Sequence, residues 1–159
     1  LGLVGSEMCI RDRYTAGELI EWSREIRNKI NKLYTFIHPL DEKIKGCSHI
    51  LWGGLPTLEI SNASNAVFYG DKAIDRSPCG TGTCARMAQW FAKGKLKVGD
   101  TFVHESIIGS VFTGRIEKEV IIGNIKGVIP SIEGSSRIIG YNRLILDPND
   151  PYVKGFQVI

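Results

Sequence analysis

Hydrophobic residues recur at three- and four-residue steps near the start of the chain, at Leu19, Trp22, Ile26, Ile30 and Leu33. This spacing places them on one face of a helix and predicts a helix over about residues 15–34. The segment Thr15-Ala16-Gly17-Glu18 has the Ser/Thr-x-x-Glu form of a capping box, which marks a helix start. The charged residues between the apolar positions are expected to face solvent.

Further along, the pattern changes to short aromatic and β-branched runs separated by glycine. The runs HILWGG (49–54) and AVFYG (66–70) predict strands. The run TCARMAQWFAKG predicts a second helix, capped by Thr81 or Thr83 and ending at Gly94. Because its apolar residues lie almost all the way round, we expect this helix to be buried at the centre of the fold.

Beyond Gly99-Asp100 the chain is rich in β-forming residues as far as Leu146. Glycine, proline and a Ser-Ser pair interrupt these runs, so we expect about five or six short strands there. No helical pattern separates them, which favours antiparallel structure over repeated βαβ units. The sequence DPNDP (147–151) indicates a loop or the end of a domain, and the strand-like GFQVI (155–159) is expected to pair elsewhere.

Composition excludes several classes of protein. The 159 residues, 43% hydrophobic and 23% charged, are enough for one globular domain with its own core. The net charge of +3 and the scattered basic residues predict no nucleic-acid partner and no membrane partner. No apolar run is long enough to predict a transmembrane helix. Four cysteines at irregular spacing do not make a disulfide framework, which predicts a reducing, cytoplasmic setting.

Residues 1–13, LGLVGSEMCIRDR, differ from the rest of the chain. Their apolar start is too short and too mixed for a signal peptide, and no small-residue cleavage site follows it. They resemble translated sequencing-adaptor read-through. We therefore expect this leader to be non-native and the chain to begin inside a longer protein.

The stretch DRSPCGTGTCARMA (75–88) carries the strongest candidate chemistry. Gly80 and Gly82 allow a tight turn and leave backbone N–H groups open to a ligand. A helix start of this kind attracts a carboxylate or phosphate, and its field also stabilises a thiolate. Cys79 is therefore a candidate reactive thiol beside an anion site, with a buried structural thiol as the alternative.

Other functions of this stretch are less consistent with its context. A Cys79–Cys84 disulfide would be strained across a helix start. The letters GTGTCA match a dinucleotide-binding fingerprint, but that motif needs a preceding strand and a βαβ unit, so we reject it. A metal site formed by Cys47, His49 and Cys79 lacks any ligand spacing typical of metal centres, and we predict no metal.

A thiol hydrolase is an alternative from another class of enzyme. Cys79 and His104 would be its nucleophile and base, and Asn124 or Asn142 would orient the imidazole. The competing interpretation of His104 is a strand histidine whose hydrogen bonds are satisfied, and we favour it.

Several long segments are similar to the C-terminal part of the proline racemase family: DRSPCGTGTCARMA, FVHESIIGSVFTGRI, GVIPSIEGSSRIIGYNRLILDPNDP and the terminal GF. The resemblance covers nearly all of residues 14–159 and implies proline racemase, 4-hydroxyproline epimerase or 3-hydroxyproline dehydratase activity. It also implies an α/β (α+β) fold, a diaminopimelate-epimerase-like lobe in which a mostly antiparallel, β-barrel-like sheet surrounds a central helix. Family members use no cofactor and hold an imino-acid substrate between two such lobes.

The resemblance implies a role for each residue of the motif. Cys79 is the acid/base contributed by the second lobe, and it works opposite a second cysteine across the substrate's α-carbon. Asp75 binds substrate, while Gly80 and Thr81 hold its carboxylate. The dehydratases carry threonine at the cysteine position, so Cys79 favours an epimerase or racemase. His49 resembles a position where hydroxyproline epimerases have histidine and proline racemases have cysteine, which favours 4-hydroxyproline over proline as substrate.

The first-lobe motif of this family, Met-Cys-Gly-His, is not matched. Cys9 follows a methionine, but Ile10-Arg11-Asp12 comes next, so we interpret Cys9 as unrelated to catalysis. We expect residues 14–146 to be the C-terminal catalytic lobe and residues 147–159 to be a tail that pairs with the missing N-terminal lobe. The fragment alone is then expected to be inactive, an inactive remnant is a further alternative, and a homodimer is one expected form of the full-length enzyme.

Overall fold

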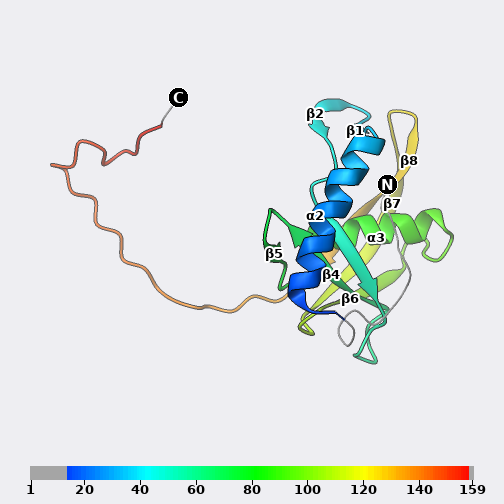
Figure 1. Cartoon of the computed structure of the whole chain (residues 1–159). Coiled ribbons are helices and arrows are strands. Elements are labelled where there is room, and N and C mark those ends of the chain that lie inside the picture. The colour runs from blue at the N-terminus through cyan, green and yellow to red at the C-terminus, as the bar shows by residue number, and fades with distance from the viewer. Residues whose placement is uncertain (1–13, 158–159) are drawn as a thin grey trace.

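The computed structural model describes residues 14–157 and shows two helices and eight strands within them (Figure 1). The helices are α2 (Ala16–Leu33) and α3 (Gly80–Ala92). The strands, in chain order, are β1 (Ile37–His38), β2 (Asp41–Lys45), β3 (Ile50–Gly54), β4 (Ala63–Tyr69), β5 (Ala73–Ile74), β6 (Thr101–Ser106), β7 (Val111–Ile122) and β8 (Ile125–Glu133). Neither helix has the length and apolar character needed to span a membrane.

The start of α2 confirms the predicted capping box. Thr15 is the N-cap, and its side chain accepts a hydrogen bond from the Glu18 N–H at 3.3 Å. The Glu18 carboxylate in turn accepts the Thr15 N–H at 2.8 Å. Leu19 and Ile30, two members of the predicted apolar stripe, are buried.

The main sheet has the strand order β3-β4-β6-β7-β8, and the short β5 also pairs with β4. Its neighbouring strands are antiparallel except for β4 and β6, which are parallel. The strands beyond Gly99, which are β6, β7 and β8, pair antiparallel as expected, whereas β4 and β6 form a parallel pair that the sequence analysis did not predict. A parallel pair needs a long crossover connection, and the chain between β4 and β6 supplies one that contains α3.

Different helices cover the two faces of this sheet. On one face, Met87 of α3 packs against Phe102 and Ile116. On the other face, Leu19 of α2 packs against Ala66. Successive residues of β4 thus point alternately to α3 and to α2, as expected from the two-residue period of a strand. The mostly antiparallel α/β architecture confirms the predicted fold class.

The burial predicted for the second helix is only partly correct. Thr83, Arg86 and Met87 of α3 are buried, but Ala85 and Ala92 are exposed. Counting alanines as apolar overestimated the burial, because a methyl side chain tolerates exposure on a helix surface. α3 ends at Ala92, and Gly94, with φ +70°, follows as predicted.

The number of strands predicted beyond Gly99 is wrong. Three strands, not five or six, follow Gly99, and β8 ends at Glu133. Residues 134–157 contain no helix or strand and run away from the folded body (Figure 1). Ile139 and Tyr141, in the segment predicted as strand, are 99% and 91% exposed. A strand forms only beside a partner that satisfies its backbone groups, and within residues 14–157 none lies next to this segment.

Candidate functional site

The loop that precedes α3 places Cys79 at the helix N-cap. Its Sγ accepts a hydrogen bond from the N–H of Gly82 at 3.3 Å. The prediction of Thr81 or Thr83 as the cap is therefore wrong. Because the helix begins at Gly80, Thr83 lies within its first turn, and its hydroxyl donates to the carbonyl oxygen of Pro78 at 3.1 Å. The thiol itself thus occupies the N-cap position, where serine, threonine, aspartate and asparagine are preferred.

The first N–H groups of α3 are available for a ligand. Gly80 and Thr81 are exposed, and among residues 14–157 their N–H groups have no hydrogen-bond partner. Unpaired N–H groups at a helix start carry partial positive charge and favour an anion. An anion bound there would lie beside the residue that carries the thiol.

Gly82 is required for close packing at this helix start. A Cβ on Gly82 would lie 3.1 Å from Cδ1 of Leu51 and 3.1 Å from Cγ2 of Val67. Glycine therefore lets α3 approach β3 and β4 and keeps the Gly82 N–H within reach of the Cys79 thiol. Gly80, by contrast, has open space around it.

The backbone of Cys79 is strained. With φ 62° and ψ 120°, Cys79 is the one non-glycine residue with positive φ among residues 14–157. Such a conformation costs about 1–3 kcal/mol and persists only where the surroundings impose it. Cys79 is also buried, with 8% of its surface exposed.

Asp75 and Ser77 link the loop to the backbone of Cys79. Oδ1 of Asp75 accepts hydrogen bonds from the N–H of Ser77 at 2.9 Å and from its hydroxyl at 3.0 Å. The Ser77 hydroxyl oxygen accepts the Cys79 N–H at 3.1 Å. No hydrogen bond to Oδ2 of Asp75 occurs among residues 14–157, so this oxygen is available to a substrate.

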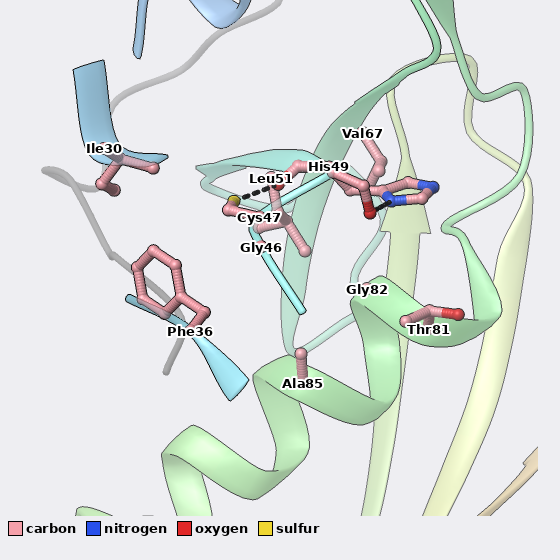
Figure 2. Close-up of a pocket in the computed structure, with 11 residues that line it drawn as sticks. Ile30, Phe36, Gly46, Cys47, His49, Leu51, Val67, Thr81, Gly82 and Ala85 are labelled. Carbon is pink, nitrogen blue, oxygen red and sulfur yellow. Dashed lines mark hydrogen bonds between the residues drawn. The ribbon is translucent and has the colours of Figure 1, made fainter. Parts of the chain in front are cut away.

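A cavity of about 360 Å³ opens beside the helix start (Figure 2). Figure 2 shows Thr81, Gly82 and Ala85 of α3 on one side and the segment that carries Cys47 and His49 on the other. Of the predicted site residues, His49 and Thr81 line this cavity, whereas Cys79, Gly80 and Asp75 do not. The predicted residues therefore form two adjoining groups. One group, His49 and Thr81, lines the cavity, and the other, Asp75, Cys79 and Gly80, lies in the loop and helix start beside it.

His49 is exposed and partly fixed by its neighbours. Its Nδ1 lies 2.8 Å from the Ser48 hydroxyl, and its ring stacks on Tyr69 with 6.4 Å between ring centroids. The backbone before it is held by Asn31 of α2, whose amide accepts the Cys47 N–H at 2.7 Å and donates to the Cys47 carbonyl at 2.8 Å. Sequence reasoning missed Asn31, because the helical pattern marks it only as a polar position.

The arrangement around His104 contradicts a thiol hydrolase. His104 is fully buried, and its Nδ1 lies 3.0 Å from the Thr83 hydroxyl and 3.2 Å from Nδ2 of Asn65. No hydrogen bond joins it to Cys79 within residues 14–157. Burial, and then the charge of Arg86, lowers the pKa of His104 to about 3, far from that of a base working near neutral pH.

The proposed orienting residues do not reach His104 either. Asn124 lies in the turn between β7 and β8, and Asn142 lies in the extended segment after β8. Instead, Asn65 lies beside the His104 imidazole, with 3.2 Å between Nδ2 and Nδ1, and the sequence analysis did not identify it. A polar residue at a buried position of the strand ASNAVFY was the available signal.

The remaining thiols form neither a disulfide nor a metal site. Cys47, Cys79 and Cys84 are free, so the structure contains no Cys79–Cys84 disulfide, the pairing that the sequence analysis disfavoured as strained. Burial, followed by the charge of Cys79, raises the pKa of the Cys84 thiol and keeps it protonated. Among residues 14–157 no group of three or more His, Cys, Asp or Glu side chains could hold a metal ion. Cys9 and the proposed leader lie outside the described residues.

Comparison with known proteins decides the family. The family model described as proline racemase matches residues 5–157. The chain belongs to the proline racemase family. Its relatives include the 4-hydroxyproline 2-epimerases of Spirosoma linguale, 64% identical over 93% of this chain, and Ancylobacter novellus, 58% identical over 92%.

Solved structures of this family show the same fold. A hydroxyproline epimerase from Agrobacterium vitis, with bound trans-4-hydroxy-L-proline, matches 94% of this chain with a TM-score of 0.74 and 29% identity. A probable proline racemase from Agrobacterium radiobacter, with bound carbonate, matches 89% with a TM-score of 0.73 and 30% identity. The chain spans 44% of the length of the two epimerases named above, and 44% and 41% of the two solved chains.

Proposed function

We propose that this chain is the C-terminal half of a 4-hydroxyproline 2-epimerase and that Cys79 is one of its two acid/base residues. The observation that carries the proposal is the position of the thiol. Its sulfur caps α3 directly beside the unpaired N–H groups of Gly80 and Thr81. The named epimerases that match this chain support the choice of reaction.

The geometry suits removal of an α-proton next to a carboxylate. As the Cα–H bond breaks, the proton passes to the Cys79 thiolate, and the electron pair delocalises into the substrate carboxylate. The N–H groups of Gly80 and Thr81 would stabilise the charge that develops there. The Gly82 N–H, which already donates to Sγ, stabilises the thiolate before transfer. A thiol from the other lobe then donates a proton to the opposite face of the α-carbon and inverts it, without a cofactor.

Asp75 is suited to bind the positive end of the same substrate. Its Oδ1 is occupied by Ser77, so the unpaired Oδ2 is the atom proposed to accept from the ring ammonium of the imino acid. If Asp75 binds the substrate's ammonium group and the helix N–H groups bind the substrate's carboxylate, the α-carbon of the substrate would be oriented toward Cys79.

His49 is proposed to distinguish hydroxyproline from proline. Its exposed ring lies on the cavity that begins at Thr81 and Gly82, where a ring hydroxyl could accept or donate a hydrogen bond. The bound trans-4-hydroxy-L-proline of the Agrobacterium vitis relative supports this substrate. Proline itself, which lacks the hydroxyl, is the second candidate.

The missing half of the protein is part of the proposal. The chain spans 44% of the relatives' length, so the second cysteine would come from another lobe. The predicted division was a lobe of residues 14–146 and a pairing tail of 147–159. Because β8 ends at Glu133, we place the start of the pairing tail at residue 134. A cytoplasmic location, which the free thiols favour, and a homodimer of the full-length enzyme belong to the same proposal.

A chimera tests the function. The N-terminal part of the Spirosoma linguale relative is joined to residues 14–159, and loss of the α-proton signal in D₂O is followed by NMR. We expect exchange with 4-hydroxyproline, slower exchange with proline, and none with this chain alone. Cys79→Ala should abolish exchange, while the matched Cys84→Ala should retain it. Exchange with proline only would favour the racemase, and no exchange in a folded chimera would contradict both and indicate an inactive remnant.

A further inference from the structure

The strained backbone of Cys79 needs a restraint, and part of that restraint comes from the peptide bond that precedes it. The carbonyl oxygen of Pro78 accepts two hydrogen bonds, from Nδ2 of Asn65 at 2.7 Å and from the Thr83 hydroxyl at 3.1 Å. One donor comes from β4 and the other from the first turn of α3. The plane of the Pro78–Cys79 peptide is therefore oriented from two sides.

His104 of β6 joins the two donors. Its Nδ1 lies 3.0 Å from the Thr83 hydroxyl and 3.2 Å from Nδ2 of Asn65. The ring is neutral at physiological pH because it is fully buried. If Nδ1 carries the proton it donates to Thr83, and if Nδ1 is bare it accepts the second N–H of Asn65. In either tautomer it supports a donor to the Pro78 carbonyl.

Burying three polar side chains together at this place lowers the stability of the fold. Asn65, Thr83 and His104 are all buried, and the Asn65 Oδ1 and His104 Nε2 atoms have no hydrogen-bond partner among residues 14–157. Apolar side chains would fill the same space without leaving unpaired polar atoms. A cluster that gives up stability at this place is consistent with a functional demand on the neighbouring loop.

We propose that Asn65, Thr83 and His104 form a buried positioning cluster for Cys79. By fixing the Pro78 carbonyl, the cluster imposes the positive φ of Cys79 and holds its sulfur against the Gly82 N–H. The three residues do not touch substrate, and they act through the peptide bond before the reacting thiol. The catalytic consequence rests on the proposed function, whereas the restraint on the loop does not.

The experiment compares Thr83→Val with Thr83→Ser in the chimera described above. Valine keeps the shape of threonine but removes the hydroxyl, whereas serine keeps the hydroxyl. We expect Thr83→Val to lower kcat by about 10- to 100-fold with little change in KM, because a displaced base affects the transition state more than substrate binding. Thr83→Ser should restore most of kcat. Thr101→Val, an exposed position on the same strand as His104, is the matched control and should leave both constants unchanged.

A second measurement does not depend on activity. Amide hydrogen exchange reports whether the N–H groups of Cys79 and Gly82 stay protected. Thr83→Val should accelerate the exchange of these two amides by about tenfold, while the amides of β7 and β8 keep their wild-type rates. If Thr83→Val does not fold, Asn65→Leu, which removes the other donor to Pro78, should give the same local change.

The outcomes separate the two proposals. An inactive wild-type chimera that still shows the local change in amide exchange would contradict the proposed function and support the positioning cluster. Equal kcat and equal amide exchange in wild type and Thr83→Val would overturn the cluster. A loss of protection spread evenly over the sheet would also overturn it, because it would show a purely structural role.

Discussion

Helices α2 and α3 each begin with a side chain that caps the first turn, but the two caps use different chemistry. At α2, the Thr15 hydroxyl and the Glu18 carboxylate bond reciprocally to each other's backbone N–H groups on an exposed surface. At α3, the cap is the sulfur of Cys79, which is a weaker acceptor held on a strained backbone. The first cap is built for stability, and the second gives up some stability to place a thiol.

The surroundings of the two caps explain why both persist. The α2 cap depends on residues within one turn of the chain, Thr15 to Glu18. The loop before the α3 cap contacts residues far away in the sequence, because Asn65 of β4 donates to the Pro78 carbonyl oxygen and lies 3.2 Å from Nδ1 of His104 in β6. The strained start of α3 is therefore supported by the sheet behind it, whereas the start of α2 is supported by its own first turn.

The largest effect is expected from Cys79→Ser in the chimera. Serine is a good N-cap, so the melting temperature should stay close to wild type. The hydroxyl is far too weak an acid to serve as the base, so α-proton exchange should fall by at least about 100-fold. The equivalent change at the other helix, Thr15→Ser, should leave both properties unchanged. Substantial α-proton exchange by the Cys79→Ser variant would contradict the proposal that the α3 cap supplies a catalytic base while the α2 cap only stabilises its helix.

Gly82→Ala should have the next largest effect. Its Cβ would lie 3.1 Å from atoms of Leu51 and Val67, and such overpacking costs about 1–3 kcal/mol of unfolding free energy. The glycine in the first turn of α2 provides the contrast. Gly17 has no neighbour closer than 3.9 Å, so Gly17→Ala should stabilise the chain by about 0.4–1 kcal/mol. Urea titrations of the two variants would give opposite shifts of the midpoint, and a shift in the same direction would refute the packing argument.

Thr15→Ala removes the hydroxyl from the α2 cap. The loss of this cap is expected to lower the free energy of unfolding by about 0.5–2 kcal/mol. The Cys79 site should be unaffected, because no hydrogen bond from Thr15 reaches the loop before α3. Thermal melting and α-proton exchange of the chimera would show a lower melting temperature with unchanged kcat. A parallel loss of kcat would mean that the two helix starts are coupled.

The smallest effect concerns pH. The backbone N–H of Thr15, and then its hydroxyl, lowers the pKa of Glu18 below its usual 4.5. A lowered pKa in the folded state adds stability that is present above pH 4.5 and is lost as the pH falls through the folded-state pKa. Glu18→Gln should therefore reduce the fall in melting temperature between pH 4.5 and the lower folded-state pKa of Glu18. An unchanged profile would show that the carboxylate adds nothing to the cap.

Features that depend on neighbouring residues in the chain could be predicted from the sequence. The capping box at Thr15, the helix stop at Gly94 and the strands near residues 50 and 66 are all present. The predictions that failed concerned long-range contacts. The segment around Ile139 has the composition of a strand, but a strand needs a neighbour, and composition cannot supply one.

The properties of the candidate site likewise divide into those that depend on neighbouring residues in the chain and those that depend on long-range contacts. The sequence by itself determined the family and the thiol at a helix start, because the motif at residues 75–88 is contiguous and the local glycines allow a tight turn there. Only the tertiary structure decided that Cys79 is the cap, that His104 is buried and neutral, and that Asn65 bonds to the Pro78 carbonyl. The physical reason is that these properties come from burial and hydrogen bonds between β4, β6 and α3, which sequence spacing cannot specify.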